Sequence, residues 1–208
     1  MWQHSLVCLD ASPIRPVQRV AALLHDLGKP RTRELSEKTR DYTFYNHEAV
    51  GAEMADEWLR QYRFSNEERK TIVHLVRHHL ICYSSEWSDA AVRRFVRRVG
   101  PEHVDALMDL GRADAIGKGK PVDDEFAALE ELRARIAASI AKGTAFGTKD
   151  LAISGRDVMD TLGVQPGPIV GRILEQLLER VIEEPSLNER ESLLSLVEAY
   201  AGAMEPPA

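Results

Sequence analysis

The sequence has little cysteine, because only Cys8 and Cys82 occur among its 208 residues. Two cysteines cannot build a disulfide framework or a zinc site made of thiolates. This content is typical of proteins in a reducing cytosol, so we expect the protein to be cytoplasmic. The formal net charge of −6 argues against general coating of nucleic acid, although it does not exclude a local basic patch.

Long apolar runs are also missing. No stretch approaches the roughly 18 apolar residues that a membrane-spanning helix needs, and no basic start precedes an apolar segment. Contact with a membrane and secretion are therefore not expected. Alternating β patterns are rare, and apolar residues instead recur every three to four positions, which predicts an all-α helical bundle. The expected helices span 2–11, 15–28, 47–62, 66–80, 88–99, 102–116, 123–141, 155–163, 168–183 and 188–202.

Several helix ends carry local signals. Ser65 stands three residues before a glutamate, as in a capping box, and Ser186 has the same spacing to Glu189. Gly28 and Pro30 are predicted to end the second helix. These signals place helix ends at positions that the apolar pattern alone leaves open.

The chain is predicted to consist of a helical core over 1–141 and a small helical tail over 142–208. The segment 142–154, KGTAFGTKDLAIS, has the composition of a joint between them. The longest early loop, 30–46, is charged and without periodicity. Such a loop often covers or contacts a substrate, but a plain surface connection explains it equally well.

The adjacent pair His25-Asp26 is the most informative feature of the chain. It lies in RVAALLHDLGKP, at the end of an otherwise apolar helix. An imidazole beside a carboxylate is costly to bury unless something binds both groups. A divalent metal ion is the commonest such partner.

Helical phase identifies further polar side chains that face inward, because residues three, four and seven positions apart share a helix face. These side chains are His4, His47, His79 and Asp114. Each one alone is more simply explained as a hydrogen-bonded core residue. Together with His25 and Asp26 they predict a metal centre, since burying all six without a cation carries a large desolvation cost. Nitrogen and oxygen ligands suit one or two ions of manganese, iron, nickel, cobalt, zinc or magnesium.

The order His4, His25-Asp26, Asp114 resembles the H…HD…D signature of the HD-domain metal-dependent phosphohydrolases. His47 and His79 match the additional histidines of members that hold two metals. Seven longer segments follow one another in a characteristic order: LLHDLGKP, NHEAVGAEMA, LVRHHL, AVRRFVRRVG, RADAIGKG, DLAISGRDVM and LGVQPGPIVGRILEQLLERVI. Through these segments the chain resembles still more closely the HD region and tail of bacterial tRNA nucleotidyltransferases, the CCA-adding enzymes and their poly(A) polymerase relatives. One departure is Asn46, where that group commonly has glycine.

The resemblance implies an HD-domain helical bundle that hydrolyses phosphate esters of a nucleotide or of an RNA end, such as a 2′,3′-cyclic phosphate. His25 and Asp26 would then be catalytic, and Asp26 would bridge two metal ions. Lys29, directly after the pair, would neutralise a phosphate, although lysines at helix C-termini are also common for dipole reasons. The partners would be a phosphate-containing nucleotide or RNA, including tRNA.

Two alternatives remain open at this stage. The sequence has no D-x-D carboxylate pair and no strand-rich region, so we do not expect it to add CCA by itself. The HD core would then serve as a tRNA-binding scaffold whose metal site is vestigial. A third interpretation is a phosphohydrolase of deoxynucleoside triphosphates or nucleoside monophosphates.

The segment VRRFVRRVG places four arginines on the face opposite its apolar residues. The simpler interpretation is a solvated face that keeps the helix soluble. The functional interpretation is a strip that binds the phosphates of a substrate, with Arg94 and Arg98 as the contacting residues.

Overall fold

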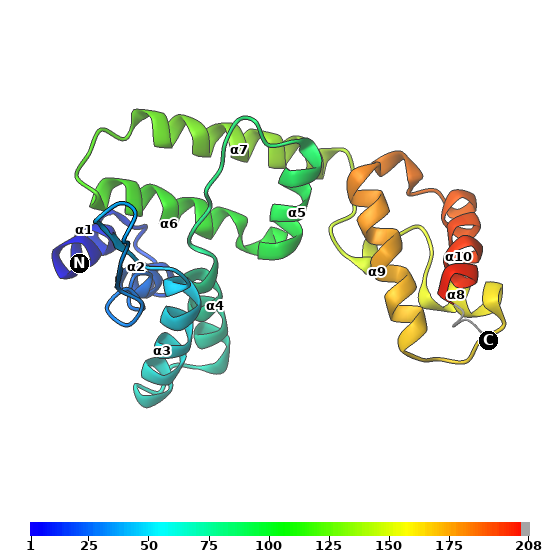
Figure 1. Cartoon of the computed structure of the whole chain (residues 1–208), viewed down its shortest axis with the longest axis horizontal. Coiled ribbons are helices and arrows are strands. Elements are labelled where there is room, and N and C mark those ends of the chain that lie inside the picture. The colour runs from blue at the N-terminus through cyan, green and yellow to red at the C-terminus, as the bar shows by residue number, and fades with distance from the viewer. Residues whose placement is uncertain (205–208) are drawn as a thin grey trace. The chain divides into compact units, whose positions relative to one another are not determined.

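The computed structural model describes residues 1–204, and over these residues the chain forms ten α-helices and one two-stranded sheet (Figure 1). The predicted all-α fold is confirmed. The last four residues of the predicted tail, 205–208, lie outside the described part. The helices are α1 (Trp2–Ala11), α2 (Pro16–Leu24), α3 (His47–Gln61), α4 (Asn66–His78), α5 (Asp89–Val99), α6 (Val104–Gly117), α7 (Asp123–Ala141), α8 (Gly155–Leu162), α9 (Pro168–Glu183) and α10 (Arg190–Met204), with 3-10 turns η1 (Pro101–His103), η2 (Thr148–Asp150) and η3 (Pro185–Leu187).

The chain divides into two compact units. The first contains Met1–Ser85 and Glu102–Arg133, and the second contains Glu86–Pro101 and the residues from Ala134 onward. The division falls within α7, which contributes to both units. The predicted domain boundary after residue 141 stays a prediction, because compactness alone does not establish where a domain begins.

In the first unit, α2 and α6 pack on each other and both pack on α1 and on α4, while α3 packs on α4. Small residues permit this close packing: Ala21 and Ala22 on α2 are fully buried, as is Cys8 on α1. Larger apolar side chains from α4 and α6, such as Leu75 and Leu107, fill the space between the helices. This packing brings the inward-facing histidines and aspartates of the first unit close to one another.

In the second unit, α9 is the central helix, packed against α5, α8 and α10. Its buried face, which includes Ile173, Leu177 and Val181, forms a core with Val158 of α8 and Leu193 of α10. This unit contains none of the histidines singled out in the sequence.

The helix ends agree with the local signals at Ser65, where both hydrogen bonds of the capping box form. Two other expectations are wrong. Ser186 does not cap α10: it lies in η3, its hydroxyl donates to Glu184 directly before that turn, and α10 begins only at Arg190. The second helix ends at Leu24, four residues before Gly28. A series of tight turns replaces the expected last turn, so the His25-Asp26 pair follows the helix instead of belonging to it.

The loop 30–46 contains a short hairpin that the sequence patterns did not predict. Strands β1 (Glu34–Leu35) and β2 (Tyr42–Thr43) pair in antiparallel register. Two-residue strands are too short to show a period of two in the sequence. Among the described residues, no helix has the length and apolar character needed to cross a bilayer.

Candidate metal centre

The first unit brings the six predicted ligands together. His4 lies on α1 and Asp114 on α6, and His25-Asp26 follows α2 directly. His47 is the first residue of α3, and His79 is the residue that caps the C-terminus of α4. Residues up to 110 positions apart in the sequence therefore meet at one end of the bundle. Their role as metal ligands stays a prediction.

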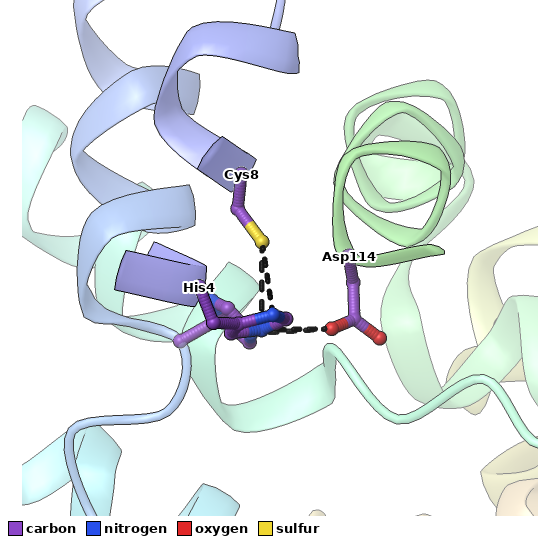
Figure 2. A group of neighbouring side chains, drawn as sticks. His4, Cys8 and Asp114 are labelled. Atoms are coloured by element: carbon purple, nitrogen blue, oxygen red, sulfur yellow. Dashed lines mark hydrogen bonds and ion pairs between the residues drawn. The ribbon is translucent and has the colours of Figure 1, made fainter. Parts of the chain in front are cut away.

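Three of these residues form a first group. The Nε2 atom of His4 lies 3.2 Å from Nε2 of His25 and 3.2 Å from Oδ1 of Asp114. Figure 2 shows His4 on its helix, pointing toward Asp114 on α6. Two ligands bound at about 2.1 Å to one ion are roughly 3.0–3.4 Å apart, so these separations suit a shared cation.

Three residues form a second group: Asp26, His47 and His79. The Nε2 atoms of the two histidines are 3.2 Å apart. Both histidines are buried. The second group thus repeats the arrangement of the first, with two imidazole nitrogens at the spacing of ligands to one ion.

The carboxylate of Asp26 lies between the two groups. Its Oδ2 atom is 3.5 Å from Nε2 of His4 and 3.5 Å from Nε2 of His25. Its Oδ1 atom is 3.6 Å from Nε2 of His47 and 3.8 Å from Nε2 of His79. Each oxygen therefore faces one histidine pair, which is the arrangement that a bridging carboxylate requires.

Backbone carbonyls fix the tautomers of three histidines. The Nδ1 atoms of His25, His47 and His79 lie 2.7–2.8 Å from backbone carbonyl oxygens. A carbonyl oxygen only accepts, so each Nδ1 carries a proton and each ring directs its Nε2 atom inward. Where both facing Nε2 atoms are unprotonated, their lone pairs at 3.2 Å repel each other unless a cation lies between them. The donor set therefore fits divalent metal ions.

The electrostatics of the centre agree with this arrangement. Burial lowers the pKa of His79 to about 4, so its imidazole is neutral near pH 7. Burial opposes ionisation of Asp114, but hydrogen bonding from His25 and the charge of Lys118 hold the pKa of that carboxyl below its usual range. For Asp26, burial again raises the pKa, but His25 and Lys29 lower it by more, so the pKa of this carboxyl lies below its ordinary value. Both carboxylates are therefore charged and available to a cation.

Two residues near the centre, Cys8 and Lys118, were not predicted as site residues from the sequence. Cys8 lies one helical turn after His4, and its Sγ is 3.5 Å from Nε2 of His4 (Figure 2). Burial raises the pKa of this thiol to about 12, so it is protonated near pH 7. Lys118 lies one turn after Asp114, with Nζ 3.2 Å from the carboxylate. Their spacing of four residues from a predicted ligand was the signal available in the sequence.

Two lysines border the centre. A cavity of about 300 Å³ lies against it, lined by Met1, His4, Asp26, Lys29, His79, Leu80, Asp114 and Lys118. The Nζ atom of Lys29 lies 2.7 Å from Oδ2 of Asp26. Lys29 is therefore at the centre as expected, and its role toward a phosphate stays a prediction.

A direct backbone contact at Gly28 joins the His25-Asp26 turns to α3. A Cβ atom at this position would lie 2.1 Å from the carbonyl oxygen of His47 and 2.7 Å from the nitrogen of Gly51. Only glycine permits this approach, which brings Asp26 next to His47. Asn46, directly before α3, has φ of 60°, and asparagine is the residue that tolerates this left-handed conformation best after glycine.

The arginines of α5 have partners that the sequence did not reveal. The expectation that all four face away from the core is wrong for Arg93, which is buried and donates to the backbone carbonyl of Ile182 at 2.6 Å. Arg94 pairs with Glu183 of α9. Carboxylates far along the chain thus neutralise most of this face.

The remaining two arginines of α5 differ from each other. Arg97 pairs with Glu175 and Glu179 of α9. Arg98 is exposed, and its guanidinium lies 5.6 Å from the centre of the Phe95 ring. Contact of Arg94 or Arg98 with a substrate phosphate stays a prediction, and for Arg94 it would have to compete with an existing ion pair.

Comparison with known proteins identifies the relatives of this chain. A family model described as tRNA nucleotidyltransferase domain 2, putative, matches residues 34–197. An A-adding tRNA nucleotidyltransferase of Deinococcus radiodurans is 34% identical over 163 residues, which cover 77% of this chain and 36% of that protein. A CC-adding tRNA nucleotidyltransferase of Thermus thermophilus is 33% identical over 195 residues, covering 88% and 41%.

A CCA-adding enzyme of Lactococcus lactis subsp. cremoris is 26% identical over 172 residues, covering 78% of this chain and 38% of the relative. The chain therefore spans about two fifths of the length of these relatives. No solved structure is significantly similar to it. The resemblance to tRNA nucleotidyltransferases is confirmed, and this chain belongs to the tRNA nucleotidyltransferase family, in the region described as its domain 2.

Proposed function

We propose that this chain binds tRNA as the helical part of a tRNA nucleotidyltransferase-related protein. The observation that carries the proposal is the match to the family's domain 2 over residues 34–197. The names of the relatives describe enzymes that add nucleotides to tRNA. A helical scaffold for the same RNA is the role that this shared region supports best.

The test is a titration of labelled tRNA with the full chain at several salt concentrations. Saturable binding is expected, with an affinity that falls as salt rises because bound phosphates release counterions. Unlabelled tRNA should compete, whereas double-stranded DNA of equal length should compete weakly. No binding at low salt, or equal competition by the DNA, would contradict the scaffold role.

A specific observation favours a second function, metal-dependent hydrolysis of a phosphate ester. The two oxygens of Asp26 face two histidine pairs, and two lysines border the adjoining cavity. Asp114 would complete the first group. A divalent ion held there supplies Lewis acidity toward water and phosphate oxygens.

The side chains of the chain itself would bind and orient the substrate. Lys29 and Lys118 would attract phosphate oxygens, because both residues line the cavity and their ammonium groups lie beside Asp26 and Asp114. The carbonyls that accept from the Nδ1–H groups hold the imidazoles in one orientation. The centre thus combines preset ligands with positive charge beside it.

The assay uses chelator-treated protein reloaded with manganese, iron, nickel, cobalt, zinc or magnesium. Its substrates are bis-p-nitrophenyl phosphate, 2′,3′-cyclic AMP, a deoxynucleoside triphosphate and a nucleoside monophosphate, which separate the candidate substrate classes. Asp26→Ala should lower activity by several orders of magnitude, while exposed Asp105→Asn on α6 should leave it unchanged. Activity that survives both Asp26→Ala and EDTA would exclude the centre as its source.

A further inference from the structure

The hairpin segment from Lys29 to Tyr45 concentrates positive charge on an acidic chain. It contains five basic and three acidic residues, whereas the whole chain carries −6. Its exposed cations are Arg31, Arg33, Lys38 and Arg40. Within the described residues, no carboxylate forms an ion pair with any of these four, unlike Arg94 and Arg97 of α5. These charges are therefore available to an anionic ligand.

The same segment exposes aromatic rings. Tyr45 is 76% exposed and Tyr42 is 47% exposed, although both are large and partly apolar. The guanidinium of Arg33 lies 3.6 Å from the centre of the Tyr42 ring, so a flat cationic group and an aromatic ring are already stacked. Rings and guanidinium planes of this kind are the surfaces on which unpaired bases stack.

Both ends of the segment are anchored at the candidate metal centre. At one end Lys29 contacts the carboxylate of Asp26 at 2.7 Å. At the other end the carbonyl of Phe44 accepts the Nδ1–H of His47 at 2.8 Å. Lys29 and Phe44 also approach each other, with Nζ 5.9 Å from the ring centre. A ligand bound along the hairpin therefore lies beside the metal centre.

We propose that the segment from Lys29 to Tyr45 forms an arm that binds single-stranded RNA, with bases stacked on Tyr45 and Tyr42 and phosphates held by Arg31 and Arg33. This inference rests on the proposed binding of tRNA and assigns its unpaired nucleotides to the arm. Stacking needs bases that are not already paired, which favours a single strand over a duplex. Unpaired guanidinium groups supply the attraction for its phosphates.

The test measures binding of the full chain to three labelled probes: a tRNA, an unstructured RNA of about twelve nucleotides, and an RNA duplex of that length. Tyr45→Leu should weaken binding to the tRNA and the single strand roughly five- to a hundredfold, since it removes a stacking surface. Tyr45→Phe keeps the ring and should restore wild-type affinity. The double variant Arg31→Gln/Arg33→Gln should lower the salt slope by about 0.7 for each lost contact.

The matched control is Arg63→Gln/Lys70→Gln, which removes two exposed charges from the same unit where α3 ends and α4 begins. It should bind like the wild type. If the wild type binds tRNA and the arm variants bind equally well, the arm is overturned while the tRNA-binding function stands. If the wild type binds no RNA at low salt, both are overturned. If Tyr45→Leu lowered the affinity for the duplex as much as the affinity for the single strand, stacking of unpaired bases would be refuted. If Tyr45→Leu abolished self-association of the protein without weakening RNA binding, the arm would be a protein interface instead.

Discussion

The position of Asp26 between two histidine pairs makes a prediction about metal-induced stability. At a metal concentration about 100 times the Kd, each bound ion stabilises the fold by about 2.7 kcal/mol. For a chain of this size, each kcal/mol raises Tm by about 2–4 °C, so each ion should raise Tm by roughly 5–11 °C. The wild type should therefore show two such increments as a divalent metal is titrated.

Loss of a ligand that weakens metal affinity about 100-fold leaves only about 0.4 kcal/mol per ion at the same metal concentration. Asp114→Asn should remove one increment because Asp114 faces only the first group. His47→Ala should remove the other increment. Asp26→Asn should remove both, since its two oxygens face both groups.

The assay is differential scanning calorimetry of each variant in EDTA and in manganese or zinc, with the metal content determined on the same samples. For each variant, only the difference in Tm between the metal and EDTA samples is compared, so changes in metal-free stability cancel. Asp105→Asn, an exposed carboxylate on α6, serves as the control and should keep both increments. The bridging argument is refuted if Asp26→Asn loses a single ion, or if Asp114→Asn and His47→Ala each lose both.

Three further outcomes are expected. Gly28→Ala should destabilise the fold by about 1–3 kcal/mol in a urea titration, because the new Cβ would press on the carbonyl of His47. It should also reduce the Tm increment from the ion at His47 and His79. An unchanged urea midpoint would show that the backbones at Gly28 and His47 separate without cost. In EDTA, the unfolding free energy should fall from pH 6.5 toward pH 4 by on the order of 3 kcal/mol more in the wild type than in His79→Gln. The pKa of His79 in the folded protein, about 4, lies below the ordinary value of 6.5, so the unfolded chain takes up the proton first as the pH falls. Parallel plots of unfolding free energy against pH for the two proteins would contradict a buried neutral imidazole. Arg93→Ala should lower the unfolding free energy by about 1–3 kcal/mol, because two carbonyls at the end of α9 lose their donor, whereas Arg98→Ala should change it little; equal effects on thermal unfolding would mean that the buried hydrogen bonds contribute nothing.

The helices were predictable because their signals are local. The period of the apolar residues and the capping box at Ser65 depend only on neighbours in the sequence, and they placed most helix ends within two residues. The end of α2 was not predictable in this way. His25 turns its Nδ1–H to the carbonyl of Ala22, and Gly28 packs on the backbone of α3, so a distant segment decides where this helix stops.

The charged face of α5 also depends on residues that are distant in the sequence, in this case through ion pairs. The sequence shows four arginines without a neighbouring acid, which suggests a free basic strip. The carboxylates that pair with Arg94 and Arg97 come from α9, about 80 residues later. Because ion pairs form through space, the sequence could not show that Arg94 and Arg97 are paired, while the exposed cations of the hairpin form no ion pair within the described part of the chain.

For the candidate metal centre, the sequence by itself identified the six polar residues, because helical phase and the His25-Asp26 pair are properties of short segments. It also carried the resemblance to the tRNA nucleotidyltransferases through its motifs. The resemblance also implied that His47 and His79 serve a second metal and that Asp26 bridges the two ions. Only the tertiary structure supplied the distances within each group, turned one oxygen of Asp26 toward each histidine pair, and added Cys8 and Lys118 at the edge of the centre. Distances between side chains depend on how helices pack, and a periodic pattern tells which way a residue faces but not which residue it meets.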